Sequence, residues 1–150
     1  MTNDKISIGN CGQYFVAAEL ERHGFTAAVP MSNTRDFDIL AINRNDSSKQ
    51  YAIQVKTNAG NKLSWVLNKK NETIIGKNIY YVFVNLNDGE NPDYFIVPSK
   101  TVATYISSIH QEWLNTAGKH GQKHNDSSMR KFAIDDNDLG KYKNNWSILK

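Results

Sequence analysis

The sequence contains a single cysteine, Cys11, in 150 residues. This excludes an intramolecular disulfide and any cysteine-rich zinc site. No stretch approaches the roughly 18 apolar residues that a membrane-spanning helix needs. The first residues, Met-Thr-Asn-Asp-Lys, do not resemble a signal peptide. From these absences we expect an intracellular, cytoplasmic protein without a membrane partner.

Several common catalytic signatures are also missing. The chain has no glycine-rich phosphate loop, no Ser-His-Asp order and no cysteine in a nucleophilic context. His120 and His124 are four residues apart, as two metal ligands on a helix would be. Their loop-like surroundings and the lack of a third ligand favour incidental histidines instead. His110 and Trp113, at helical spacing, are best explained as packing residues.

The charge is mildly basic, +3 at neutral pH, which permits nucleic-acid binding without requiring it. Basic side chains concentrate in two stretches, 57–77 and 118–131. These stretches supply candidate phosphate contacts, with solvated surface lysines as the alternative. Trp65 could stack on a base, or it could be an ordinary core aromatic. The candidate nucleic-acid-binding residues are Lys62, Trp65, Lys69, Lys70, Lys119 and Lys123.

Two strand-like runs, 38–43 and 51–57, flank a short polar connector of turn-forming residues. We expect them to fold into a hairpin. Gln54 and Lys56 are two residues apart, so they point to the same face of their strand. Lysine is depleted from buried strands unless it is paired. The hairpin would bring Asp38, at the start of the first run, close to both side chains.

This grouping has a limited set of chemical uses. The Asp38 carboxylate and the Gln54 carbonyl offer hard oxygen atoms, which suit Mg²⁺. A lysine beside a metal can orient or deprotonate a water, or stabilise negative charge on a phosphate. Together these are the parts of a phosphodiester-hydrolysing site. The alternative is a structural ion pair between Lys56 and Asp38 at the end of a strand.

Asp38, Gln54 and Lys56 follow a helix that runs from Gly12 to Gly24, and this arrangement resembles the PD-(D/E)XK nuclease superfamily. That superfamily includes restriction endonucleases, Holliday-junction resolvases and some homing endonucleases. The resemblance covers roughly residues 9–60. It implies an α/β restriction-endonuclease-like core, with a mixed sheet flanked by helices in α-β-β-β-α-β order. It also implies a DNA endonuclease that uses Mg²⁺ or Mn²⁺ and can form a dimer or higher homo-oligomer.

The chain departs from the family pattern at two acidic positions. Gln54 stands where the second acid usually stands, and Gln13 occupies the position of the helix acid, with Glu19 as an alternative. At 100° per residue, Gln13 lies on the apolar side of the helix and Glu19 on its flank. Either residue would complete the outer shell of groups around the metal. The alternatives are a Gln13 bonded to backbone near the helix start and a solvated Glu19.

The shortage of acid supports a second hypothesis, a catalytically weak or inactive nuclease-fold module that binds nucleic acid or a protein partner. Asp36 lies near Asp38, but its direction depends on whether the strand contains a bulge. An open cleft at Asp38, Gln54 and Lys56 would favour catalysis, and a plugged one would favour the module.

Hydrophobic periodicity and turn residues predict a single α/β domain over residues 1–150. Ser99 is expected to cap the second helix, and the run 79–86 to form a central strand buried on both faces. We expect helices at 9–23 and 100–117, strands at 25–30, 37–43, 51–57, 62–68, 79–86, 93–98 and 131–134, a mobile loop at 118–129 and helical tendency at 135–149.

Overall fold

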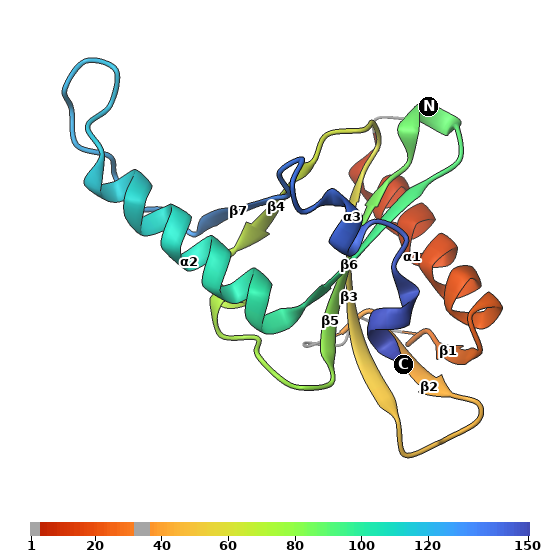
Figure 1. Ribbon diagram of the computed structural model, residues 1–150. Coiled ribbons are helices and arrows are strands. Elements are labelled where there is room, and N and C mark those ends of the chain that lie inside the picture. The colour runs from red at the N-terminus through yellow and green to blue at the C-terminus, as the bar shows by residue number, and fades with distance from the viewer. Residues whose placement is uncertain (1–3, 32–36) are drawn as a thin grey trace.

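The computed structural model describes residues 4–31 and 37–150, which form two sheets with helices packed against them (Figure 1). The main sheet has five strands in the order β1-β2-β3-β5-β6, and a small sheet pairs β4 with β7. The expected mixed α/β architecture is confirmed. The elements are α1 (Lys5–Arg22), β1 (Phe25–Ala28), β2 (Ile39–Asn43), β3 (Gln50–Asn58), β4 (Ser64–Asn68), η1 (Lys69–Glu72), β5 (Ile79–Asn85), η2 (Asn87–Gly89), β6 (Asp93–Pro98), α2 (Ser99–Asn115), β7 (Met129–Ala133), α3 (Leu139–Tyr142) and η3 (Trp146–Leu149).

The main sheet mixes strand directions. β1, β2 and β3 form an antiparallel meander, β3 and β5 are parallel, and β5 and β6 form an antiparallel hairpin. A parallel pair needs a crossover connection. Here the crossover contains β4 and η1, and the helix implied by the α-β-β-β-α-β order follows β6 instead, as α2.

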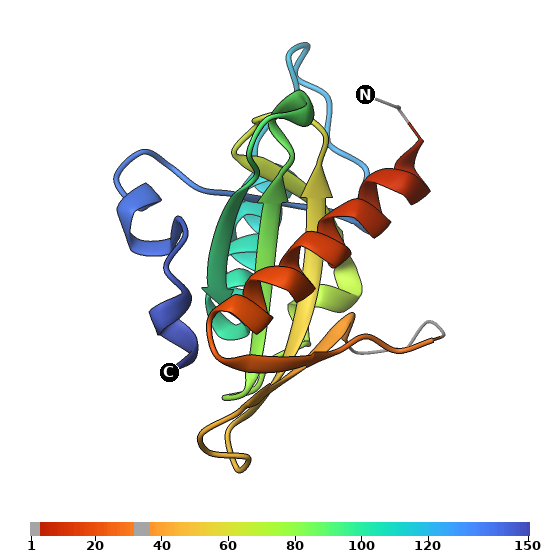
Figure 2. The same ribbon diagram turned by 90° about the vertical axis from the view of Figure 1, so that its right-hand side faces the viewer.

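Each face of the main sheet has its own hydrophobic core. Side chains alternate along a strand, so β5 sends Val82 and Val84 to one face and Tyr81 and Phe83 to the other. Figure 2 shows α1 crossing the first face, where its Val16 is fully buried. α2 and the small sheet cover the second face. The prediction of a central strand buried on both sides is therefore confirmed.

α1 is fixed against the sheet by its caps and by one glycine. It begins four residues before the expected start, where Asp4 accepts hydrogen bonds from two backbone N–H groups of the first turn. It ends before Gly24, whose φ of 94° favours glycine. A Cβ added to Gly12 would lie 1.9 Å from Thr57 Oγ1, so glycine permits the close approach of α1 to β3.

One prediction is corrected by a long-range contact. Pro98, not Ser99, is the N-cap of α2, and the Ser99 hydroxyl binds both the N–H and the carbonyl of Gly76 at 3.1 Å. The predicted strand β4 pairs with β7 in the small sheet and not with a strand of the main sheet. The helical tendency predicted for 135–149 is seen as the short helices α3 and η3, with turns between them. Within the described residues, no helix has the length and apolar character to cross a membrane.

Candidate active site

The site lies where β2 separates from β3. The paired part of β2 begins with Ile39 opposite Ile53, and the backbone N–H of Asp38 donates to the Ile53 carbonyl at 2.8 Å. One step further, Asp38 Oδ2 accepts a hydrogen bond from the Val55 N–H at 2.7 Å. The carboxylate thus replaces the backbone carbonyl that the next ladder bond would use. These two bonds hold Asp38 at the point where the pairing of β2 and β3 begins, which is called the fork below.

Gln54 and Lys56 lie on the face of the sheet that carries α2. Their register partners on β5 are Tyr81 and Phe83, which belong to the core on that face. The β2–β3 register ends at the Ile39–Ile53 pair, so Asp38 lies just beyond it and is placed by its bonds to Ile53 and Val55. The bond to Val55 and the charge effect of Asp38 on Lys56 place this carboxylate near Lys56, while Gln54 shares the strand face of Lys56. Gln54 is almost fully buried, whereas Lys56 is only partly buried.

The electrostatic environment of Lys56 is unusual for a surface lysine. Burial lowers the pKa of its ammonium group, because a low-dielectric environment disfavours the charged form. The Asp38 carboxylate opposes this effect and raises the pKa, whereas the charge of Lys70 lowers it further. Lys56 therefore faces both an anionic and a cationic neighbour.

The structure connects only one of the two candidate helix residues to this group. Gln13 Nε2 donates to the backbone carbonyl of Asp38 at 2.9 Å, so Gln13 ties α1 to the start of β2. Glu19 instead pairs with Arg22 at 2.6 Å and lies 3.6 Å from His23 Nε2. Asp36 lies outside the described residues.

η1 forms a wall beside the site, a feature that sequence reasoning missed. Asn71 Nδ2 donates to the Tyr81 hydroxyl at 2.8 Å, and both residues are buried. Glu72 pairs with Arg130 of β7 at 2.5 Å. Because Tyr81 is the register partner of Gln54, the Asn71–Tyr81 bond holds η1 near the site residues, and the Glu72–Arg130 pair joins η1 to β7. The sequence signal was the Asn68/Asn71 capping box, which predicts only the local turn.

The candidate nucleic-acid contacts fall into separate groups. Lys62 lies on the β3–β4 connection and Lys69 and Lys70 on η1, all exposed and on the segment that follows β3. Lys119 and Lys123 are exposed on a loop that projects beyond the C-terminal end of α2, away from β3 (Figure 1).

The suggestion that Trp65 stacks on a base is wrong. Its side chain is 2% exposed and packs against Phe83 and Phe95, with ring centroids 4.9 and 5.4 Å away. Its indole N–H donates to the Val84 carbonyl at 3.1 Å. Trp65 is a core residue that joins the small sheet to the main one.

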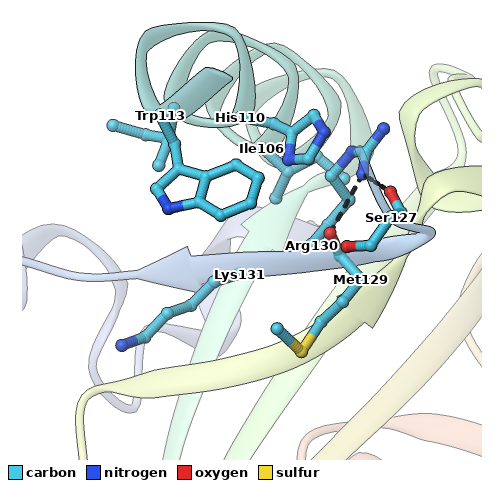
Figure 3. Close-up of a pocket in the computed structure, with 8 residues that line it drawn as sticks. Ile106, His110, Trp113, Ser127, Met129, Arg130 and Lys131 are labelled. Carbon is cyan, nitrogen blue, oxygen red and sulfur yellow. Dashed lines mark hydrogen bonds between the residues drawn. The ribbon is translucent and has the colours of Figure 1, made fainter. Parts of the chain in front are cut away.

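A hollow of about 210 Å³ between α2 and β7 is separate from this site (Figure 3). Two of its polar side chains already have partners, since His110 Nε2 lies 2.7 Å from Asp126 and Arg130 donates to the Ser127 and Met129 carbonyls. His110 is buried, as expected of a packing residue. Trp113 is 41% exposed and stacks on the His124 ring at 4.1 Å.

The oxygen donors at the fork suit a divalent cation whose remaining ligands come from the substrate and from water. Among the described residues, Asp38 has a hydrogen bond on only one carboxylate oxygen, and Gln54 adds an amide. No group of three His, Cys, Asp or Glu residues within these segments could hold a metal. Mg²⁺ commonly uses one or two carboxylates together with substrate phosphates and water. The donor set suits that kind of binding.

No family model and no curated protein matches the sequence, but solved structures share its architecture. A bacterial homing endonuclease, I-Ssp6803I, has a TM-score of 0.58 at 13% identity, and the match covers 99% of this chain and 92% of that chain. Hjc, a Holliday junction resolvase from Archaeoglobus fulgidus, has a TM-score of 0.54 at 16% identity, with coverage of 89% and 88%. At these identities the likeness shows the fold.

Proposed function

We propose that this chain, which has the restriction-endonuclease-like fold of the PD-(D/E)XK nucleases, is a metal-dependent DNA endonuclease. Asp38, Gln54 and Lys56 would form its active site. The observation that carries the proposal is a hydrogen-bonded Asp38 carboxylate whose charge acts on a partly buried Lys56. The two structural neighbours, an endonuclease and a Holliday junction resolvase, support DNA as the substrate.

Asp38 and Gln54 would hold Mg²⁺ or Mn²⁺ through their side-chain oxygens. The bound ion would supply positive charge for the phosphate and a more acidic water. Because the protein offers one carboxylate here, substrate phosphate and water would provide the remaining ligands. Cation binding is therefore expected to be much tighter when DNA is present.

Lys56 would orient the attacking water and stabilise the negative charge that develops on the phosphate. Burial lowers the pKa of Lys56, so this lysine gives up a proton more readily than a surface lysine does. Gln13 would act as a positioning residue, because it holds the backbone of Asp38. Lys62, Lys69 and Lys70 would bind phosphates beside the cleaved bond.

A catalytically weak or inactive module is the second candidate. It is favoured by the amide at position 54 and by the lack of a three-ligand His, Cys, Asp or Glu group in the described segments. Such a module would bind nucleic acid or a protein partner without cutting DNA. It predicts binding that is independent of Mg²⁺. For both candidates, the formation of a dimer or higher homo-oligomer stays a prediction, which analytical ultracentrifugation would check.

Nicking and cleavage assays on plasmid, linear duplex and four-way-junction DNA test the proposal. We expect the wild type to cut at least one of these substrates with Mg²⁺ or Mn²⁺, and none with EDTA. Asp38→Asn should abolish cutting, because it removes the charged ligand. The matched control, Asp136→Asn, changes an exposed aspartate elsewhere and should keep activity. Full activity in Asp38→Asn would overturn the site, and DNA binding without cleavage would favour the inactive module.

A further inference from the structure

A hollow of about 450 Å³ opens beside Lys56, on the side away from Gln54. Lys5 and Ile8 of α1 form one wall, the end of β3 forms the floor, and Trp65 and Val66 of β4 form the other wall. It lies at the carboxyl end of β3, which runs parallel to β5. Crevices at the carboxyl ends of strands are where open α/β sheets usually bind ligands.

Hydrogen bonds fix the turn that joins two sides of this hollow, the end of β3 and β4. Asn58 Nδ2 donates to the carbonyls of Lys62 and Ser64 at 3.0 and 2.9 Å, which holds the turn between β3 and β4. The Asp88 N–H donates to the Ala59 carbonyl at 2.9 Å, which ties the same turn to η2. A hollow whose lining is already ordered binds a ligand without the free-energy cost of ordering that lining.

The lining combines positive charge with apolar surface. Lys5 and Lys56 contribute ammonium groups, and no carboxylate lines the hollow in the described part of the chain. Ile8 and Val66 provide apolar contacts, and the buried Trp65 lies behind Val66 in the lining. The volume falls within the roughly 300–1,000 Å³ of typical small-ligand sites. An anionic ligand with a flat, largely apolar part, such as a nucleotide, matches both features.

We propose that the hollow holds one unpaired nucleotide of the substrate strand, next to the phosphodiester bond at Lys56. Lys5 would bind its phosphate, and Ile8 and Val66 would contact its base and sugar. This inference rests on the proposed nuclease function and names the substrate class, DNA with an unpaired nucleotide beside the cleaved bond. A base-paired nucleotide must first leave the stack to enter, and that step costs energy which an unpaired one does not spend.

The test compares cleavage of a fully paired duplex with that of the same duplex carrying one unpaired nucleotide. We expect wild type to cut the second substrate about tenfold faster or more, because extrusion of a paired base is unfavourable. Val66 is 66% exposed, so substitutions there should leave the fold intact. Val66→Glu should remove the preference by placing a carboxylate in the hollow, whereas the matched Val66→Thr should keep it. Lys5→Ala should weaken the preference and Lys49→Ala, at an exposed lysine on the β2–β3 turn, should not.

A binding measurement separates this inference from the nuclease proposal. Asp38→Asn protein is titrated into duplexes with 2-aminopurine as either the unpaired or a paired base. We expect a fluorescence change with the unpaired base that Val66→Glu, added to Asp38→Asn, abolishes. Equal cleavage of both duplexes, unchanged by Val66→Glu, would overturn the hollow while leaving the nuclease standing. If the wild type cuts neither duplex, and cuts no plasmid or four-way-junction DNA either, the nuclease proposal fails. The fluorescence change then supports the hollow as a nucleotide site, and its absence overturns it.

Discussion

Asp38 and Val55 are joined across the end of the β2–β3 ladder by a 2.7 Å hydrogen bond from the Val55 N–H to the Asp38 carboxylate. One carboxylate oxygen therefore completes the backbone pairing, and the charge of the carboxylate acts on Lys56, whose pKa it raises. The same side chain has a structural role and a proposed chemical one. Substitutions at Asp38 can separate the two roles.

Asp38→Ala should lower the free energy of unfolding by about 1–2 kcal/mol, because the Val55 N–H loses its acceptor. Asp38→Asn keeps an oxygen that can accept this bond, so its stability should stay within about 0.5 kcal/mol of wild type. Urea denaturation of both variants measures the difference. Equal destabilisation by Ala and Asn would show that the charge, not the hydrogen bond, holds the fork.

Gln13→Glu should disturb the site by removing the hydrogen bond that α1 makes to the backbone of Asp38. The Gln13 amide donates to the Asp38 carbonyl at 2.9 Å, and a carboxylate there would face that carbonyl as a second acceptor. We expect a loss of about 1–2 kcal/mol in stability and slower cleavage. Gln50→Glu is the matched control, because Gln50 makes the same kind of bond, to the Ser47 carbonyl at 3.0 Å, on the exposed β2–β3 turn. If both variants cleave DNA equally, Gln13 does not position the site.

The grouping at the fork could be predicted from the sequence because it depends on local rules. Side-chain alternation places Gln54 and Lys56 on one face, and a short polar turn makes a hairpin of β2 and β3. These rules predict that Asp38 lies near Gln54 and Lys56, but not the bonds to Ile53 and Val55 that hold it there. The position of Gln13 on the apolar side of α1 was likewise visible in its helical spacing.

Contacts between distant segments could not be predicted in this way. β4 pairs with β7 across a long separation, and that pairing buries Trp65, which the sequence alone left open as a base-stacking residue. The Asn71–Tyr81 bond likewise depends on how the crossover returns to the sheet. Ser99 was misassigned for the same reason, since Gly76 rather than the first turn of α2 satisfies its hydroxyl. Local patterns carry no information on these partners.

Gly12→Ala should destabilise the protein by overpacking α1 against β3. The added Cβ would meet Thr57 Oγ1 at 1.9 Å, and such overpacking typically costs about 1–3 kcal/mol. Thr57→Ala removes the nearest atom and should rescue part of this loss in the double variant. Chemical denaturation of the single and double variants gives the coupling energy. Strictly additive effects would contradict the close contact.

Gln54→Glu restores the commoner family pattern and adds one negative charge to the site. In a working nuclease it should maintain or raise affinity for Mg²⁺ or Mn²⁺, because a carboxylate is a stronger ligand for a hard cation. In an inactive module it would bury a carboxylate beside Asp38, and mutual repulsion should lower the melting temperature at neutral pH. Calorimetric metal titrations with DNA present, together with melting curves, separate the two. Binding of no metal by either protein would favour the module.

The most direct test of the proposed active site is Lys56→Met, measured for single-turnover cleavage and for DNA affinity on the same substrate. Methionine keeps much of the side-chain volume and removes the charge. Lys49→Met, at an exposed position, is the matched control. Because Lys56 is assigned to the transition state, cleavage should fall by about 100-fold or more. DNA affinity should change by less than about tenfold. A parallel loss of affinity and cleavage would contradict this assignment and make Lys56 a phosphate-binding residue.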